Sequence, residues 1–245
     1  MLYLMIKSLK LYNIFIYIMN MNSISDIQHA FYINLDIRPD RKQHVEEQMA
    51  KIGINCQRFR AIKLENGAIG CSMSHLKILE TAKQNNWDHV LIVEDDILFS
   101  KPALFVEQFN YFLSNHKDFD VLLLGGNSIP PYRKIDECCI KVTKCLTTTG
   151  YLVRNHYFDT LIQNYKEGIG KLLNDPSKQY FYAIDKYWIP LQTRDNWYLI
   201  IPLTVMQRED YSDIEKKVTN YNNVMTDLNK KAYFERIGNY KANKL

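Results

Sequence analysis

Blocks of hydrophobic and polar periodicity over residues 29–126 predict strands and helices in turn. Residues 89–93 form an almost continuous apolar run, which is typical of a strand covered on both faces. Apolar residues recur every three positions over 67–84, which predicts a helix. The predicted strands are 29–35, 55–61, 89–93 and 120–124, the last closed by Gly125 and Gly126, and the predicted helices are 39–52, 67–84 and 102–113.

The second half of the chain is less regular. Pro130 and Pro131 predict a loop, residues 140–153 predict a hairpin that turns at Gly150, and helical pieces are predicted near 158–165 and 185–191. Because strands alternate with helices in the first half, the sequence predicts one α/β domain with an open, mainly parallel central sheet. Ligands of such sheets bind beyond the carboxyl ends of the strands.

The two ends of the chain differ from this domain. We expect an apolar extension over residues 1–28, a folded domain over 29–214 and a polar tail over 215–245. Lys7 and Lys10 interrupt the apolar run at the start, and the clean stretch that follows is far shorter than the ~20 residues of a membrane span. We therefore expect a cytoplasmic protein whose contact with a membrane is at most weak and peripheral.

Composition narrows the function classes. The chain has 245 residues with a net charge of +4, and its basic residues are scattered, so nucleic-acid binding is not expected. Its five cysteines include no C-x-x-C pair, so we expect reduced thiols and propose neither a zinc ribbon nor a disulfide framework.

Three consecutive carboxylates, Glu94, Asp95 and Asp96, follow the buried strand at 89–93 directly. Carboxylates this close repel one another unless a cation neutralises them, and oxygen ligands favour Mg²⁺ or Mn²⁺. A solvated turn is the alternative for the triplet alone. A phosphatase using one Asp as nucleophile is a second alternative, but Glu94 and Leu98 stand where its D-x-D-x-T pattern needs Asp and Thr.

Four sequence blocks occur together in one order: INLDIRPDR at 33–41, GAIGCSMSHL at 67–76, LIVEDDI at 91–97 and MQREDYSDI at 206–214. Together they resemble glycosyltransferase family 25, which includes bacterial lipopolysaccharide galactosyltransferases and collagen hydroxylysine glycosyltransferases. The resemblance covers residues 29–214, and the block at 67–76 is its most specific part. It implies a GT-A-type fold, a UDP-sugar donor that carries galactose or glucose, a saccharide, glycan or hydroxylysine-type glycoprotein acceptor, and inversion at the anomeric carbon.

The resemblance also implies roles for individual residues. Asp96, with Glu94 or Asp95, matches the metal-binding triplet. The residues matched to the donor side are Asn34, Asp36, Arg41, Gly70, Cys71, Ser74, His75 and Gln207.

Ordinary structural roles remain open for several of these residues. Arg41 fits an exposed helix position, and Asp36 fits the cap of the following helix. His75 fits a hydrogen-bonded core histidine, and Cys71 fits a small packing residue.

An inverting transfer needs a general base, and Asp185 in YAIDKYW is the candidate. Its surroundings resemble the family's V-D-E-F-L-P block, but Lys186 replaces the second acidic residue. Helix capping is the alternative role for Asp185. Because of Lys186, a catalytically inactive carbohydrate- or nucleotide-binding module of the same fold also stays open.

Overall fold

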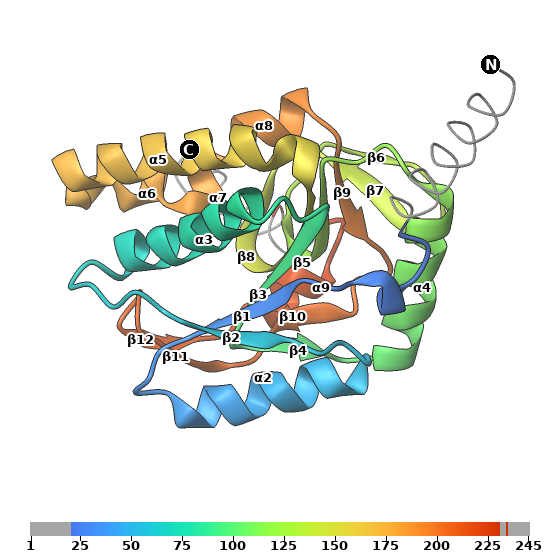
Figure 1. Cartoon of the computed structure of the whole chain (residues 1–245), viewed down its shortest axis with the longest axis horizontal. Coiled ribbons are helices and arrows are strands. Elements are labelled where there is room, and N and C mark those ends of the chain that lie inside the picture. The colour runs from blue at the N-terminus through green and yellow to red at the C-terminus, as the bar shows by residue number, and fades with distance from the viewer. Residues whose placement is uncertain (1–20, 231–233, 235–245) are drawn as a thin grey trace, which may run out of the picture.

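The computed structural model describes residues 21–230 and 234. Its centre is an eight-stranded sheet with the order β2-β1-β3-β8-β5-β9-β7-β6. All of these strands run in one direction except β7 and β8, so the sheet is open and mainly parallel. Two smaller two-stranded ladders join β4 to β10 and β11 to β12 (Figure 1).

The strands are β1 (Ala30–Asn34), β2 (Gln57–Arg60), β3 (His89–Glu94), β4 (Ile97–Phe99), β5 (Val121–Ser128), β6 (Tyr132–Lys134), β7 (Cys139–Val142), β8 (Cys145–Arg154), β9 (Trp197–Ile200), β10 (Val205–Gln207), β11 (Asp210–Ser212) and β12 (Lys217–Thr219). The α-helices are α2 (Pro39–Lys51), α3 (Gly67–Gln84), α4 (Pro102–Asn115), α5 (Phe158–Asn174), α6 (Gln179–Tyr182), α7 (Ile184–Tyr187), α8 (Ile189–Arg194) and α9 (Asn222–Thr226). Short 3₁₀ turns lie at Ile24–Asp26, Asn155–Tyr157 and Pro176–Lys178.

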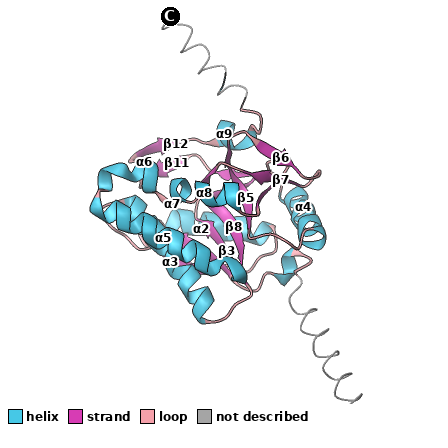
Figure 2. Cartoon of the chain, turned by 90° about the horizontal axis from the view of Figure 1, so that it is seen from above, coloured by secondary structure: helices cyan, strands magenta, loops and turns pink. Residues whose placement is uncertain are grey.

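Helices cover both faces of the sheet, which gives three layers. One core joins α3, α5, α7 and α8 to one face, and the other joins α2 and α4 to the opposite face. Figures 1 and 2 show α3 and α5 side by side on the same side of the sheet. Successive residues of β3 contribute to opposite cores, because side chains alternate along a strand. This explains why its apolar run is continuous.

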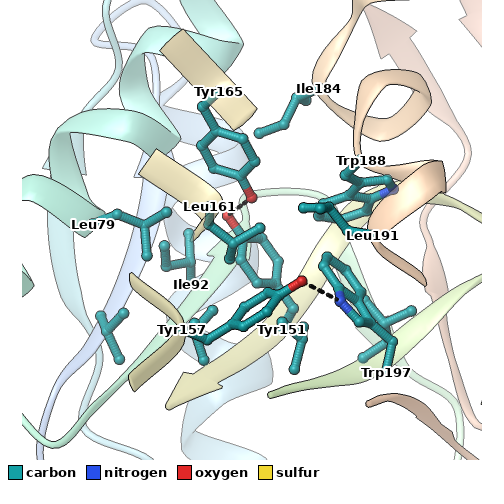
Figure 3. Packing of buried hydrophobic residues seen from close by; sticks show 14 of the residues in the cluster. Leu79, Ile92, Tyr151, Tyr157, Leu161, Tyr165, Ile184, Trp188, Leu191 and Trp197 are labelled. Atoms are coloured by element: carbon teal, nitrogen blue, oxygen red, sulfur yellow. Dashed lines mark hydrogen bonds between the residues drawn. The ribbon is translucent and has the colours of Figure 1, made fainter. Parts of the chain in front are cut away.

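Large aromatic side chains fill the core under α5 and α8 (Figure 3). The Tyr165 hydroxyl donates to the Tyr151 hydroxyl at 3.1 Å, and Trp197 Nε1 donates to the Tyr157 hydroxyl at 3.1 Å. Trp188 packs edge-on against both Tyr151 and Trp197. Each polar atom in these contacts has a partner, so the rings are buried without the cost of an unsatisfied group.

The regular first half of the chain confirms the sequence prediction closely. The helix predicted at 67–84 has those bounds, and Asn66 caps it by accepting a hydrogen bond from the Ile69 amide. Gly53 follows α2 with φ of +75°, the left-handed conformation that glycine adopts without steric cost. The α/β class with an open, mainly parallel sheet is likewise confirmed.

Two predictions in the middle of the chain are wrong. Gly125 and Gly126 do not close a strand, because β5 continues through them to Ser128. They mark close approach instead: a Cβ at 125 would lie 2.6 Å from the Val205 carbonyl oxygen. The hairpin turning at Gly150 is also absent from the described chain, since Gly150 lies inside β8, which pairs with β3 and β5, while β7 pairs with β6 and β9.

Residues 1–20, most of the expected apolar extension, lie outside the described residues. Within the described part of the chain, no helix is long and apolar enough to cross a membrane. Met21 is buried in the core between the sheet and α4. At the other end, Met225 of α9 is fully buried and Lys230 is nearly so, so ordered structure continues past 214. The boundaries at 28 and 214 remain predictions.

Gly125→Ala should destabilise the fold, because the added methyl would overlap the backbone of β10. Overpacking of this kind costs about 1–3 kcal/mol, which lowers Tm by several degrees in a domain of this size. Gly170→Ala is the matched control: a Cβ there meets nothing within 4 Å, and alanine favours the helix α5. Thermal unfolding measures both changes, and equal melting temperatures for the two variants would contradict the packing argument.

Candidate active site

The candidate site lies where the carboxyl ends of β1 and β3 meet a distorted part of β8. Ile33 of β1 pairs with Glu94 of β3, and Val93 pairs with Gly150 of β8. These registers bring Asn34, the carboxylate triplet and the threonines that precede Gly150 to one edge of the sheet. The position agrees with the rule that open α/β sheets bind ligands beyond their carboxyl ends.

Asp95 points toward β1 and α2. Its Oδ2 accepts a hydrogen bond from Asn34 Nδ2 at 2.8 Å, and its Oδ1 accepts one from Arg41 Nη1 at 2.9 Å. Arg58 Nε fixes the Asn34 amide by donating to its Oδ1 at 3.0 Å. The same Arg41 nitrogen lies 3.4 Å from Asp96 Oδ2. Asn34 and Arg41, both expected at the site, therefore touch the triplet directly.

Gln207 at the end of β10 joins the other two carboxylates. Its Nε2 donates to Glu94 Oε2 at 3.0 Å and lies 3.3 Å from Asp96 Oδ1. β10 reaches this place because it pairs with β4, the strand that begins directly after the triplet, at the register Gln207↔Ile97. Asp96 thus shares a donor with each of the other two carboxylates: Gln207 with Glu94, and Arg41 with Asp95.

A bulge in β8 aims a threonine at Glu94. Between its pairs with Gly125 and Asn127, β8 has extra residues, and Thr147 within them has φ of +74°. This conformation is a genuine outlier for a β-branched residue, and such outliers concentrate at functional sites. The adjacent Thr148 hydroxyl donates to Glu94 Oε1 at 2.6 Å. This contact could not be predicted from the sequence, because it depends on the distorted pairing of β8.

Two residues of α3, one turn apart, also face Glu94. His75 Nε2 lies 3.7 Å and Cys71 Sγ 3.8 Å from Glu94 Oε1. The other imidazole nitrogen of His75 hydrogen bonds with the Tyr151 hydroxyl at 2.8 Å, which fixes the ring. Burial first, then the nearby charges of Glu94 and Asp185, raise the pKa of Cys71 well above the ordinary value of a thiol. These effects favour the neutral thiol of Cys71 over the thiolate.

The remaining residues of the same sequence block pack elsewhere. A Cβ on Gly70 would lie 2.4 Å from the Ile62 carbonyl oxygen, and Ser74 accepts the Ile62 amide at 2.9 Å. Through these contacts, Gly70 and Ser74 hold α3 against the loop after β2. Asp36 is also displaced from the triplet: it is half-exposed and pairs with Arg58 and Arg60 at 2.9 and 2.6 Å.

A second layer of ion pairs surrounds Arg41 and was not expected from the sequence. Arg41 Nε donates to Asp210 at 3.0 Å, and Arg38 and Arg208 each bind the same carboxylate at 2.7 Å. Arg38 also pairs with Asp213 at 2.9 Å. These contacts attach β11 to the start of α2. Asp210 lies in the late MQREDYSDI block, which was the available signal, but the block alone did not distinguish it from its acidic neighbours.

The triplet holds more negative charge than its neighbours neutralise. Burial, followed by repulsion from Glu94, raises the pKa of Asp96 to about 8. Burial also raises the pKa of Asp95, although Arg41 and Asn34 oppose it. Burial acts to raise the pKa of Glu94 too, but His75, Thr148 and Arg41 outweigh it and hold that pKa below its ordinary value.

These observations fit a divalent cation. The three carboxylates are 10–20% exposed, so the site is reachable from solvent. Within the described chain, Glu94 groups with Cys71 and His75 as potential metal ligands, and the oxygen donors of the site are the three carboxylates. Hard oxygen donors of this kind suit Mg²⁺ or Mn²⁺.

Asp185, at the start of α7, supports the β8 bulge. Its Oδ2 accepts the Thr147 amide at 3.1 Å and the Lys186 ammonium at 2.7 Å. Thr147 directly precedes the threonine that binds Glu94, so Asp185 borders the site. The capping alternative is wrong, because the N-cap of α7 is Ala183 and no side chain caps this helix.

The sequence of the chain matches the model of one protein family. Residues 62–197, more than half of the 245-residue chain, match the sequence model of glycosyltransferase family 25, described as a lipopolysaccharide biosynthesis protein. The protein belongs to glycosyltransferase family 25. The expected family is thereby confirmed.

Curated relatives agree with this affiliation. A Haemophilus influenzae protein named as a glycosyltransferase is 29% identical over 122 residues, covering 41% of this chain and 42% of its own. A glycosyltransferase 25 family member of Aedes aegypti is 24% identical over 196 residues, covering 67% of this chain and 31% of its own. The matched segment thus spans less than half of each relative's length.

Solved structures resemble the chain more distantly. A glycosyltransferase involved in glycosylation of the major capsid of PBCV-1 is 11% identical with a TM-score of 0.42, covering 81% of this chain and 89% of its own. An apo-UDP-glucose pyrophosphorylase is 10% identical with a TM-score of 0.40, covering 88% and 81%.

Asp96→Asn should change how stability depends on pH in protein kept metal-free with a chelator. The folded pKa of about 8 lies above the ordinary 3.8, so the stabilising contribution of protonated Asp96 is complete below pH 4 and is lost as pH rises through 8. The asparagine variant has no such loss and should melt at a higher temperature than the parent at pH 8.5. Melting curves from pH 5 to 9 check this, with Glu107→Gln on the exposed side of α4 as control. Parallel curves for parent and Asp96→Asn would contradict the buried charge.

Proposed function

We propose that this family 25 protein is a metal-dependent, inverting hexosyltransferase that moves galactose or glucose from a UDP-sugar to a saccharide or hydroxylysine-type acceptor. Family membership supports the reaction class. The observation that carries the proposal is the surplus negative charge at Asp96, buried beside Glu94 and Asp95 at the carboxyl edge of the sheet. A buried carboxyl group such as Asp96 would be destabilising on a binding surface that holds no cation.

Asp96, with Glu94 or Asp95, would hold Mn²⁺ or Mg²⁺. Such a cation stabilises the negative charge that develops on the diphosphate as the sugar–phosphate bond breaks. Gln207 orients Glu94 and Asp96 through one amide nitrogen, and Asn34 and Arg41 orient Asp95.

The remaining donor-side residues divide by their contacts. Cys71 and His75 line the site beside Glu94, and Arg41 is the cation best placed to face the diphosphate. Gly70 and Ser74 act by positioning α3, which carries Cys71 and His75. Asp36, with Arg58 and Arg60, is proposed for the outer, nucleotide side.

Asp185 is the proposed general base. In an inverting transfer the acceptor oxygen attacks the anomeric carbon, the bond from that carbon to the phosphate oxygen breaks, and the UDP leaves with the electron pair. The proton of the acceptor hydroxyl passes to the base. Both hydrogen bonds that the described residues make to Asp185 go to Oδ2, which leaves Oδ1 for an acceptor hydroxyl.

One observation favours a second candidate function, a non-catalytic carbohydrate- or nucleotide-binding module. Lys186 pairs with Asp185 at 2.7 Å and so engages the carboxylate that is proposed as the general base. A module of this kind would bind UDP and give no product. Incubation of the protein with a panel of UDP-sugars and Mn²⁺ separates the two functions.

Asp96→Asn should slow transfer strongly and weaken metal-dependent UDP binding. Loss of a ligand that stabilises the leaving group lowers the rate by roughly 10²- to 10³-fold. Calorimetry of UDP binding with Mn²⁺ or with EDTA, together with product analysis, measures both effects. Asp175→Asn, at an exposed turn after α5, is the control and should match the parent. UDP affinity that is indifferent to EDTA would refute the metal site.

Asp185→Asn should leave Tm and UDP affinity near the parent values, because an asparagine oxygen can still accept the Thr147 amide. The transfer rate should fall by the ~10²- to 10⁴-fold typical of a lost general base. Asp159→Asn, which breaks an exposed ion pair with Lys83, is the matched control. If Asp185→Asn instead lowers Tm and keeps the rate per folded molecule, Asp185 is structural and the base lies elsewhere, with Asp195 and Asp213 next to be tested.

A further inference from the structure

A cluster of four metal-ligating residues lies at the opposite end of the sheet from β1. His116 follows the last residue of α4, and Asp136, Cys138 and Cys139 lie in the turn between β6 and β7 and at the start of β7. In Figure 1, α4 runs along the β9 and β7 end of the sheet. Four strand spacings, roughly 19 Å across the sheet, separate β7 from β3, so the cluster is distinct from the carboxylate triplet.

The potential ligand atoms of these residues all lie within 4.8 Å of one another. Cys139 Sγ is 3.8 Å from His116 Nε2 and 3.6 Å from Asp136 Oδ1, and His116 Nε2 is 2.6 Å from Asp136 Oδ2. Around tetrahedral zinc, sulfur–nitrogen and sulfur–oxygen separations are about 3.5 Å and a nitrogen–oxygen separation is about 3.3 Å. The separations from Cys139 Sγ already match, and the His116–Asp136 separation would have to lengthen by about 0.7 Å.

The surroundings hold these ligands in place. Asp136 Oδ1 accepts the backbone amides of Cys138 and Cys139 at 2.8 and 3.1 Å, which sets the turn. Cys138 lies in a bend just before β7 begins. Because side chains alternate in direction only along a regular strand, the side chains of Cys138 and Cys139 can point to the same side. The His116 ring stacks on Phe112 at 4.9 Å between centroids. Such outer contacts orient the ligands of natural metal sites.

We propose that His116, Asp136, Cys138 and Cys139 form a structural zinc site that fastens the end of α4 to the β6–β7 turn. Two thiolates, an imidazole and a carboxylate select Zn²⁺ over the Mg²⁺ or Mn²⁺ suited to the triplet. Four protein ligands leave no open coordination position, which is typical of structural sites. The cysteines are buried, while the His116 and Asp136 side chains are 21% and 27% exposed and give the ion access.

The test uses the purified full chain, reduced and stripped of metal, then titrated with Co²⁺ and with Zn²⁺. Co²⁺ should give the intense visible bands of tetrahedral coordination and a thiolate charge-transfer band, and one equivalent of Zn²⁺ should remove both. Zn²⁺ in 100-fold excess over its Kd should raise Tm by roughly 5–10 °C. Asp96→Asn should give the same spectrum, which distinguishes this site from the triplet.

Variants assign the ligands. Cys138→Ser, Cys139→Ser and His116→Gln should each lose the cobalt spectrum and the zinc-dependent rise in Tm, while Cys56→Ser, remote from the cluster, should keep both. Asp136→Asn and His116→Gln alter partly exposed side chains, so they stay informative if a buried cysteine variant fails to fold. Weak octahedral cobalt bands, a spectrum unchanged in His116→Gln, or a Cys138–Cys139 disulfide with no zinc uptake after reduction would each overturn the proposal.

Discussion

Burial of three consecutive carboxylates at the end of β3 is the constraint on which the arrangement of this end of the molecule depends. A carboxylate removed from water is strongly destabilising unless donors or cations replace the water. Separate elements supply these donors: β1 brings Asn34, α2 brings Arg41, β10 brings Gln207 and the β8 bulge brings Thr148. The strained conformation of Thr147 is tolerated because it completes this set.

Most of the fold could be predicted because its first half is locally consistent. The apolar run of β3, the stripe of α3 and the helix stop at Gly53 each follow from short-range chemistry and need no knowledge of distant contacts. The wrong predictions concern glycines whose role depends on a segment that is distant in the sequence. Gly125 makes room for the β10 backbone and Gly150 lies within the strand between β3 and β5, and neither fact can be known until strand order is known.

The same limit applies to the site. The triplet, Asn34, Arg41 and Gln207 could be found because chain order and family motifs carry them. Thr148 and Asp210 could not, since each acts through a contact between elements far apart in sequence. His116 is likewise remote from Cys138 and Cys139 along the chain, so no short spacing motif signals the cluster that they form with Asp136.

The electrostatics of the triplet are the reason for proposing that a cation, and not a further side chain, completes it. Arg41 remains charged at every accessible pH, yet its charge is shared among Asp95, Asp96 and Asp210. Burial, followed by repulsion from Glu94, raises the pKa of Asp96, so its carboxyl group favours a proton where no cation is bound. A lysine or arginine in place of that proton would neutralise the site permanently and leave nothing for a diphosphate to bind. In the proposed function, an exchangeable proton keeps this position available to a divalent ion that binds with the donor, and Gln207 holds Glu94 and Asp96 beside each other for that ion.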